Sequence, residues 1–473
     1  MGLRRPPWFR DNHHQATRPR FVELRSSKWF ITFVISFASA TDIFMYSLIV
    51  PVTPTALRDR VGIPQKNIQA WTSILMGLFS ASMLAFSPFV GYITDQFESR
   101  RWPYMLGLAA LGVATALLSI GTSIELWIAG RLFQGAAGAV VWVVGIALLA
   151  DTVGRDGLGR AIGYMSMATS VGTLTGPLLG GLLYEYCGYS SVFGLAFALI
   201  GLDICLRWML IERRHALKWL APEMRPLVAT ENESEGGTNS PLQSVLGRVG
   251  FLFSSSRLMV ALWGNFVVAL LLTSFDSVLP LFVQETFGWQ QSGQGLIFVP
   301  LIVPHVLDPV TGFVIDRFPR SCRYITAGAF FTLAPLLVLL HIVTDNSMHH
   351  KIILCSLLGL IGLCLAAVLP PLDVETFNVV EEKEEQRPGA FGPGRATALA
   401  FGLANMAFSA GSLIGPFFAG FIRQEAGWRT MSWALGLVAG LSAIPIMLFV
   451  GGWILSEPIR LHEDLDADIV PDP

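Results

Sequence analysis

The sequence predicts an all-α membrane protein with twelve transmembrane helices in two pseudo-symmetric six-helix bundles. The chain of 473 residues is 53% hydrophobic and 14% charged, with a mean hydropathy of +0.56, which is too apolar for an ordinary soluble domain. One glycine-proline pattern occurs twice, as GTLTGPLLGG at 172–181 and as GSLIGPFFAG at 411–420. A second pattern, GYITD at 91–95, returns as GFVID at 312–316. These paired patterns indicate that the chain is an internal duplication.

Hydrophobic stretches define the expected spans. A span needs about 20 apolar residues. Twelve stretches meet this requirement, at residues 28–51, 68–94, 103–122, 125–150, 160–184, 190–211, 257–284, 292–315, 324–344, 351–373, 396–422 and 428–453. The first follows an arginine-rich segment and leads into further spans, so we interpret it as a retained helix and not as a cleaved signal peptide.

Polar segments divide the chain. The connector between spans six and seven has a composition typical of disordered linkers, and a charged insertion at 379–394 accounts for most of the difference between the two repeat offsets. The predicted organisation is a basic N-terminal segment at 1–27, an N-terminal bundle at 28–211, a linker at 212–256, a C-terminal bundle at 257–453 and an acidic tail at 454–473.

Basic residues predict the orientation in the membrane. With the N-terminus inside, 24 Lys and Arg residues fall on the cytoplasmic side and six on the other, while Arg131 and Arg207 lie within spans. This bias predicts that both termini are cytoplasmic. The basic N-terminal segment is explained by topology, so we expect no nucleic-acid partner.

The sequence favours neither metal, cofactor nor ATP chemistry. The five cysteines show no paired Cys-x-x-Cys spacing, so we expect no disulfide framework and no metal site. A phosphate-binding GxxxxGK[ST] loop needs a Gly-Lys pair, and none of the five lysines follows a glycine. We therefore predict that an ion gradient drives the protein or that it equilibrates its substrate.

The duplicated glycine-proline motif predicts close helix packing. Within lipid, Gly and Pro occur mainly where helices approach each other or line a cavity. The predicted packing residues are Gly172, Gly176, Pro177 and Gly180 in the first copy and Gly411, Gly415, Pro416 and Gly420 in the second.

The ordered motifs resemble a known family. GYITDQFESRR at 91–101, GRLFQGAAGA at 130–139 and the glycine-proline motif together resemble the signatures of the major facilitator superfamily of secondary transporters. TDIFMYSLIVPVTP at 41–54 and FDSVLPLFV at 275–283 resemble its drug:proton antiporter branch, most closely vesicular monoamine transporter-like and fungal members. The resemblance implies alternating access between two rocking halves.

The loops after spans two and eight are candidates for a conformational latch. Asp95 precedes Arg100 and Arg101, and Asp316 precedes Arg317, so ion pairs with the loop and with a neighbouring helix end are expected to hold one conformation. The family pattern has a basic residue after the aspartate and a glycine before the basic pair; in the first loop Gln96 follows Asp95, and Glu98 and Ser99 precede Arg100. The alternative is that these charges only anchor helix ends at the interface.

Asp42 is the leading coupling candidate. It lies near the middle of span one, where a charge would cost about 3 kcal/mol on insertion scales. We expect it to face a central cavity and to exchange a proton or pair with a cationic substrate, a task that the resemblance also implies. The alternative is a structural hydrogen bond.

Three more polar residues complete the predicted coupling site. Asp276 lies four residues before Pro280 in span seven; it is either a second coupling carboxylate or a solvated residue near the outer end. Arg131 opens GRLFQG and cannot readily lose its proton, so it needs a partner, and Gln134 lies one turn further on. For Arg131 and Gln134 the two alternatives are a role in proton coupling and a role in helix packing or folding.

Weaker candidates lie elsewhere in the spans. Asn265 and Asn405 are expected to contact substrate. Asp373 is either a cavity group or a cytoplasmic cap. His305 and Asp308 are three residues apart, between Pro304 and Pro309, which are expected to interrupt the helix. The aromatic candidates for cavity lining are Phe44, Tyr46, Trp71 and Trp142.

These features together predict a monomeric exporter of small amphipathic organic compounds, drug-like or metabolite, by proton antiport. The plasma membrane is the expected location, with a vacuolar or vesicular membrane as the alternative. A proton-coupled symporter for nutrient uptake and a transport-inactive receptor are the competing functions. No clustered His or Ser-His machinery points to an enzyme.

Overall fold

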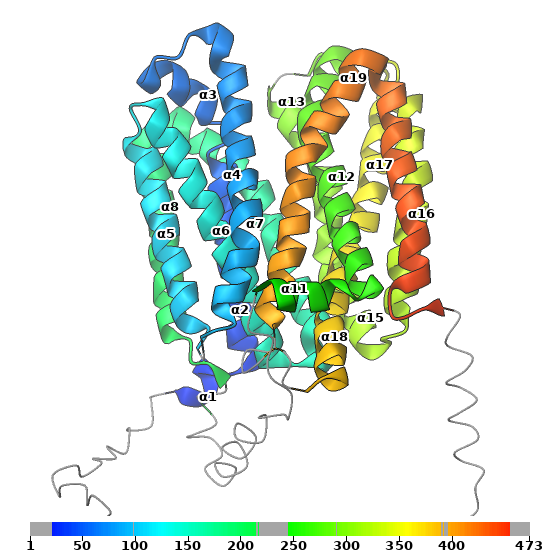
Figure 1. Ribbon diagram of the computed structural model, residues 1–473. Helices are drawn as coiled ribbons and strands as arrows, with labels where there is room; N and C mark the ends of the chain where they lie inside the picture. Colours follow the sequence, from blue (N-terminus) through cyan, green and yellow to red (C-terminus); the bar gives the residue numbers. More distant parts are fainter. Residues whose placement is uncertain are drawn as a thin grey trace, which may run out of the picture.

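The computed structural model describes residues 21–97, 99–213, 216, 245–289, 291–388, 391 and 396–454. Every regular element in this part of the chain is helical. Figure 1 shows two bundles side by side, the first in blue to green and the second in green to red. The start of α2 and the end of α19 lie at the same end of the bundles, which we call the tail side; the opposite end is the loop side.

The first bundle contains six long helices. Its elements are α1 (Val22–Arg25), α2 (Lys28–Leu48), α3 (Thr53–Ala56), η1 (Leu57–Val61), α4 (Gln65–Thr94), α5 (Arg101–Ile120), α6 (Ile124–Val153), η2 (Arg155–Gly157), α7 (Leu158–Cys187) and α8 (Tyr189–Met209).

The second bundle has the same plan with more interruptions. Its elements are α11 (Val245–Phe253), α12 (Ser256–Phe287), α13 (Gln291–Leu296), α14 (Val299–Ile302), η4 (Val303–Leu307), α15 (Asp308–Arg317), α16 (Ser321–Leu339), η5 (Leu340–Ile342), α17 (Met348–Ala366), α18 (Leu369–Gln386) and α19 (Thr397–Phe449).

The predicted twelve spans are confirmed. Ten helical stretches of the described chain are long and apolar enough to cross a membrane. The last of them, α19, turns at Gly427, where φ is 81°, and therefore crosses twice. The twelfth span is α7, which is richer in Ser, Thr and Gly because it packs against both halves and needs less apolar surface toward lipid.

The ends of the chain and most of the linker lie outside the described residues. The expected charged connector after span ten differs from the structure in part, because α18 continues as a helix to Gln386. Its charges extend the tenth span beyond the bilayer on the tail side. The first part of the predicted insertion is therefore helical.

The halves bury their inner helices and expose their outer ones. In the most apolar windows of α2 and α6, 72% of the residues are buried, compared with 28% in α8. Trp208 on α8 and Phe331 on α16 are more than two-thirds exposed, as expected of side chains that face lipid. Polar residues on α2 and α6 therefore lie inside the protein.

The glycine-proline motifs lie within their own bundles. Gly172 and Gly176 of α7 pack on α2, where a Cβ atom at Gly176 would lie 3.0 Å from the Leu48 nitrogen. In the second copy, Gly415 of α19 packs on α12, and a Cβ atom there would lie 2.5 Å from Leu270 O. The hydroxyls of Ser47 and Ser274 donate to Gly172 O and Gly415 O at 3.3 and 3.1 Å.

The last motif position differs between the copies. Gly180 has no room for a side chain because it lies against Leu48 of α2. In the alignment of the two motifs, buried Ala419 occupies the position of Gly180, and Gly420 matches Gly181. The nearest atom to a Cβ on Gly420 would be 4.0 Å away. Gly420 is therefore not a close-packing position.

Pro177 and Pro416 lie inside their helices, each directly after the central glycine.

Candidate functional site

Asp95 joins the two halves on the tail side. It follows α4 of the first half, is 4% exposed, and accepts hydrogen bonds from the backbone N–H groups of Ala398 and Leu399 at 3.1 and 2.8 Å. Those donors form the first turn of α19 in the second half, where unpaired N–H groups and the helix dipole favour an anion. Asp95 thus caps a helix of the opposite half.

Arg100 connects this cap to α6. Its guanidinium contacts Asp95 at 3.0 Å and Asp151 at 3.1 Å. Burial disfavours the charge on Arg100, but the carboxylates of Asp151 and Asp95 outweigh it and raise the pKa of the guanidinium. Arg101 makes different contacts, because its backbone N–H donates to Glu212 and its side chain to Trp208 O.

Asp316 makes the corresponding contact from the second half. It accepts hydrogen bonds from the Gly159 and Arg160 backbone N–H groups, in the first turn of α7, at 2.8 and 2.9 Å. Arg317 is exposed, and among the described residues no ion pair joins it to Asp316. The expected ion pair between Asp316 and Arg317 is therefore wrong, and the Arg317 side chain is exposed to solvent instead.

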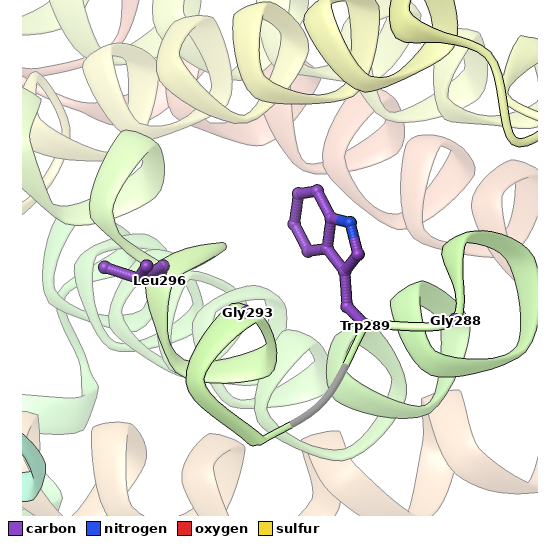
Figure 2. A pocket seen from close by; sticks show the side chains of 4 residues that line it. All are labelled: Gly288, Trp289, Gly293 and Leu296. Atoms are coloured by element: carbon purple, nitrogen blue, oxygen red, sulfur yellow. The ribbon is translucent and has the colours of Figure 1, made fainter.

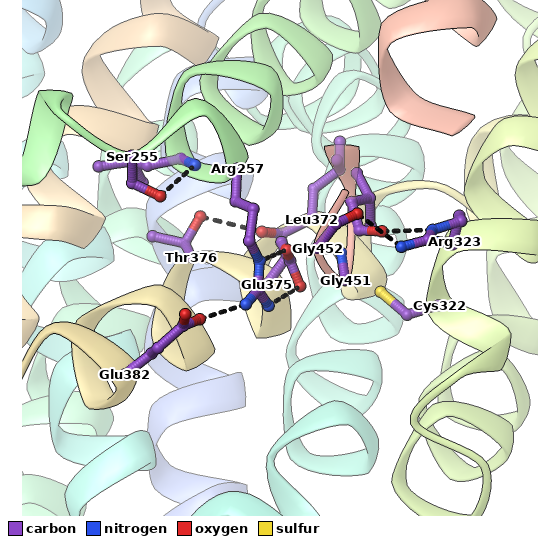
Figure 3. Close-up of polar contacts among 12 residues, drawn as sticks. Ser255, Arg257, Cys322, Arg323, Leu372, Glu375, Thr376, Glu382, Gly451 and Gly452 are labelled. Carbon is purple, nitrogen blue, oxygen red and sulfur yellow. Dashed lines mark hydrogen bonds and ion pairs between the residues drawn. The ribbon is translucent and has the colours of Figure 1, made fainter. Parts of the chain in front are cut away.

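The basic and acidic residues near the second loop hold their own bundle together. Figure 3 shows Arg257 of α12 against Glu375 of α18, with a nitrogen–oxygen distance of 2.7 Å, and a second contact to Glu382. Glu375 also accepts the Gly451 N–H at 2.8 Å. Arg323 donates to the carbonyl oxygens at the end of α19. These contacts close the tail end of the second bundle.

Glycines bring the halves close on the tail side. A Cβ atom at Gly402 of α19 would lie 2.6 Å from Ser87 O of α4, and one at Gly159 of α7 would lie 2.7 Å from Gly312 O of α15. Asn405 Nδ2 donates to Ser87 Oγ at 2.8 Å in the same region. The structure therefore describes a conformation in which the halves are closed on the tail side.

Asp42 lies inside the first bundle. It is 0% exposed, and neither carboxylate oxygen has a hydrogen-bond partner among the described residues. A Cβ atom at Gly138 of α6 would lie 3.2 Å from Asp42 Oδ2. Trp142, one turn further along α6, directs its buried indole N–H toward Asp42, but the contact does not reach hydrogen-bond geometry. Gly138 thus provides the space into which the carboxylate points.

Arg131, Gln134 and Asp276 gather around Tyr46, one turn beyond Asp42 on α2. Arg131 is 0% exposed; it donates to Gln134 Oε1 at 2.9 Å, and its guanidinium lies 5.7 Å from the Tyr46 ring centroid. Asp276 of the second half is exposed and interacts electrostatically with Tyr46. Tyr46 is therefore close to the arginine of its own half and within electrostatic reach of the carboxylate of the other half.

A buried ion pair that was not among the predicted site residues lies within electrostatic reach of Asp42. Asp203 and Arg207 of α8, 1% and 2% exposed, pair at 3.0 Å. The Arg207 guanidinium lies 3.5 Å from the Tyr104 ring centroid and donates to Tyr104 O at 2.8 Å. Both charges interact electrostatically with Asp42. The i,i+4 spacing of an acid and an arginine within an apolar span is the signal that identifies such a pair.

The remaining candidates are dispersed. Asn265 is 3% exposed and donates to Ala261 O of its own helix, and Asn405 is engaged with Ser87, so neither amide nitrogen is available to a substrate in this conformation. Asp373 is partly buried near the start of α18. His305 and Asp308 do come together, at 3.2 Å, because the prolines interrupt the helix as expected.

A shallow pocket lies on the loop side of the second bundle. It has a volume of about 400 Å³ and is lined by Gly288, Trp289, Gly293 and Leu296. Figure 2 shows the Trp289 indole extending into it. None of its lining residues is titratable, and it lies at the corner between α12 and α13, apart from the Asp42 and Arg131 groups.

Comparisons with known proteins agree with this architecture. Residues 32–384 match the Major Facilitator Superfamily model. The MFS-type transporter ppzB of Metarhizium rileyi is 30% identical over 479 residues, covering 93% of this chain and 98% of the relative. A class G tetracycline resistance protein of Vibrio anguillarum is 25% identical over 415 residues, covering 86% and 94%.

A solved structure has the same fold. The crystal structure of the human organic anion transporter TETRAN superimposes with a TM-score of 0.64 at 17% identity, covering 89% of this chain and 99% of that chain. At this identity the likeness concerns the fold alone. The family match over most of the chain, the relatives and the twelve-helix fold together establish that this protein is a membrane transporter of the major facilitator superfamily.

Proposed function

We propose that the protein exports small amphipathic organic compounds in exchange for protons, by alternating access. The observation that carries the proposal is Asp42, a fully buried carboxylate at mid-span that makes no ion pair within contact distance among the described residues and faces the Trp142 indole N–H without the geometry of a full hydrogen bond. A buried charge without a partner is costly, so the group is suited to take up a proton. The similarity to a tetracycline resistance protein supports an amphipathic substrate.

Arg131 and Asp276 are proposed to connect Asp42 to substrate. Asp276 is accessible to water although protein atoms surround it, and its charge acts on Tyr46 of the other half, so a cationic or hydrogen-bonding substrate is expected to bind there. Arg131, which donates to Gln134, lies near the same Tyr46 ring. Asp42 and Tyr46 lie one turn apart on α2, so a proton at Asp42 and substrate at Asp276 are proposed to influence each other through this helix.

The latch contacts are proposed to stabilise the state that is open on the loop side. Asp95 and Asp316 each cap a helix of the opposite half, and these hydrogen bonds must break before the tail side opens. In the proposed orientation the tail side is cytoplasmic. Export then requires the caps to form and release once per cycle.

The substitution Asp42→Asn tests the coupling role, because an amide mimics a protonated carboxylate. In vesicles with an acidic interior, accumulation of the amphipathic cation ethidium is expected to fall at least tenfold, while exchange without a gradient survives. Flux is normalised to folded transporter, and Asp345→Asn, in an exposed loop, is the matched control. Normal pH-driven flux in Asp42→Asn would exclude Asp42 and transfer the role to Asp276.

Accessible tags test the proposed orientation. Tags at Gly2 and at Gly236, both outside the described residues, are expected to be reachable only from the cytoplasm, and a tag at Asn346 only from the other side. Detection of the Gly236 and Asn346 tags from the same side would contradict the proposed topology.

A further inference from the structure

A buried histidine-aspartate pair lies where the two halves meet, outside the cluster around Asp42. His305 Nδ1 lies 3.2 Å from Asp308 Oδ2. The residues are 5% and 0% exposed, respectively. The pair belongs to the second half, in η4 and at the start of α15, about 12 Å above the tail end of α15 by helix rise.

The local sequence explains why these side chains meet. Pro304 lies in the first turn of η4 and Pro309 in the first turn of α15, so residues 303–307 form a 3₁₀ turn instead of an α-helix. In a 3₁₀ helix, side chains three residues apart eclipse each other. His305 is thereby aligned with Asp308 and not offset from it.

The first half completes this site. Ser166 of α7 donates its hydroxyl to Asp308 Oδ2. The backbones are in close contact there, since a Cβ atom at Gly163 would lie 2.6 Å from Pro309 Cα. The hydrogen bond from Ser166 and the exclusion of water both depend on contact between α7 and α15. Both are lost when the halves separate on the tail side.

No other charge balances the pair in the closed conformation. Among the described residues, Asp308 makes hydrogen bonds with Ser166 and His305 and an ion pair only with His305, and its Oδ1 has no hydrogen-bond partner. The packed elements carry other titratable groups, among them Tyr164 and Arg160 on α7, Asp156 on η2, Asp316 on α15, Cys322 and Arg323 on α16, Cys355 and Cys364 on α17, and Asp373 and Glu375 on α18. None of these makes an ion pair or a hydrogen bond with Asp308.

We propose that His305 and Asp308 form a second proton-binding site, which takes up one proton when the halves close on the tail side. An ionised Asp308 beside a neutral His305 would leave an uncompensated buried charge, which is strongly unfavourable. One added proton, shared by the carboxylate and the imidazole, makes the site neutral. After opening, water solvates the carboxylate and the proton returns to the water on the tail side.

The direction of the pH effect follows from this difference in proton binding. The closed state binds one more proton than the open state, so acid favours closure and closure is lost as the pH rises. The N-terminus of α15 lies in the same half as Asp308, so it acts on the carboxylate in both states and does not alter the difference. The effect requires neither substrate nor Asp42.

A distance measurement between the halves tests the proposal. Spin labels at Arg155→Cys and Arg320→Cys, both exposed on the tail side of opposite halves, report closure in lipid nanodiscs from pH 6.5 to 8.5, in a background with the five native cysteines replaced. The closed-to-open ratio of the otherwise unchanged protein is expected to fall with rising pH, by up to about tenfold per pH unit.

Two variants separate proton binding from a structural role. Asp308→Asn mimics the protonated acid and is expected to stay closed at pH 8.5, with little pH dependence. Ser166→Ala removes a hydrogen bond made only on closure and is expected to open at every pH. Ser170→Ala is the control, since its hydroxyl donates to the backbone of its own helix. Three results would overturn the proposal. The first is a closed-to-open ratio of the unsubstituted protein that does not change with pH. The others are an Asp308→Asn protein that opens at pH 8.5 and an Asp308→Asn protein whose ratio keeps the full pH dependence.

Failure here is distinguishable from failure of the proposed Asp42 coupling. Asp42→Asn is expected to keep the pH-dependent closure because it lies outside the His305 site. If Asp42→Asn loses the pH-dependent closure and Asp308→Asn keeps it, the proton taken up on closure binds at Asp42. This result would also overturn the second site.

Discussion

The loops at Asp95 and at Asp316 come from the same duplicated motif and make the same backbone contact, but their charged neighbours do different things. Each aspartate accepts two N–H groups from the first turn of a helix in the opposite half. Asp95 is also tied through Arg100 to Asp151. Asp316 depends on backbone donors alone among its described hydrogen bonds.

The charges of the second half are used within that half. Arg257 and Glu375 join α12 to α18, and Arg323 holds the end of α19. A duplicated sequence thus preserves the contact made by the backbone, while the ion pairs around it diverge. The contact at Asp95 thus combines a helix cap with an ion pair, whereas the contact at Asp316 is a helix cap beside a bundle that its own ion pairs close.

The largest expected effect concerns the second half. Arg257→Met removes the guanidinium that pairs with Glu375, whose side chain is 1% exposed. The free energy of unfolding, measured by thermal unfolding in detergent, should fall by about 3–5 kcal/mol because a buried charge is left unpaired. The distance between halves should be unchanged. Arg423→Met is the control, because its partner Glu285 is 68% exposed, and surface pairs contribute about 0–1 kcal/mol. Equal stability of the two variants would show that the Arg257 cluster does not hold the bundle.

The next test compares the aspartates directly. Asp95→Asn loses a buried ion pair as well as part of its cap and should weaken closure by about 3 kcal/mol. Asp316→Asn loses part of a cap alone and should weaken it by about 1 kcal/mol. Spin-label distances on the tail side measure both, with Asp345→Asn as the control. If Asp316→Asn has the larger effect, the proposed difference between the latches is wrong.

The smallest expected effects concern the glycine-proline motifs. Gly176→Val must displace α2 and should reduce transport and folded abundance, at a cost of about 1–3 kcal/mol for overpacking. Gly415→Val should behave alike on α12, whereas Gly420→Val should be tolerated as well as Leu182→Val on the lipid-facing surface. Similar tolerance at Gly176 and Gly420 would contradict the packing difference between these positions.

Much of the fold was predictable from the residues because a bilayer imposes simple requirements. Apolar stretches of span length and the 24 to six distribution of basic residues follow from the chain alone. The chain alone did not predict that α18 continues as a helix to Gln386, because charged residues beyond the bilayer are compatible with both a helix and a loop. Gly420 was misassigned for a similar reason, since both glycines of a Gly-Gly pair match the motif and only one faces the neighbouring helix.

The sequence by itself determined that Asp42, Arg131 and Asp276 are costly residues within apolar spans, since that cost depends only on chemistry and depth. Only the tertiary structure decided their partners: Asp42 faces Gly138, and Tyr46 lies near Arg131 and is acted on by the charge of Asp276. The same holds for Ser166 and Asp308, which are 142 residues apart in the chain. Contacts between separate helices depend on how the helices rotate and cross, and that geometry results from packing over the whole bundle.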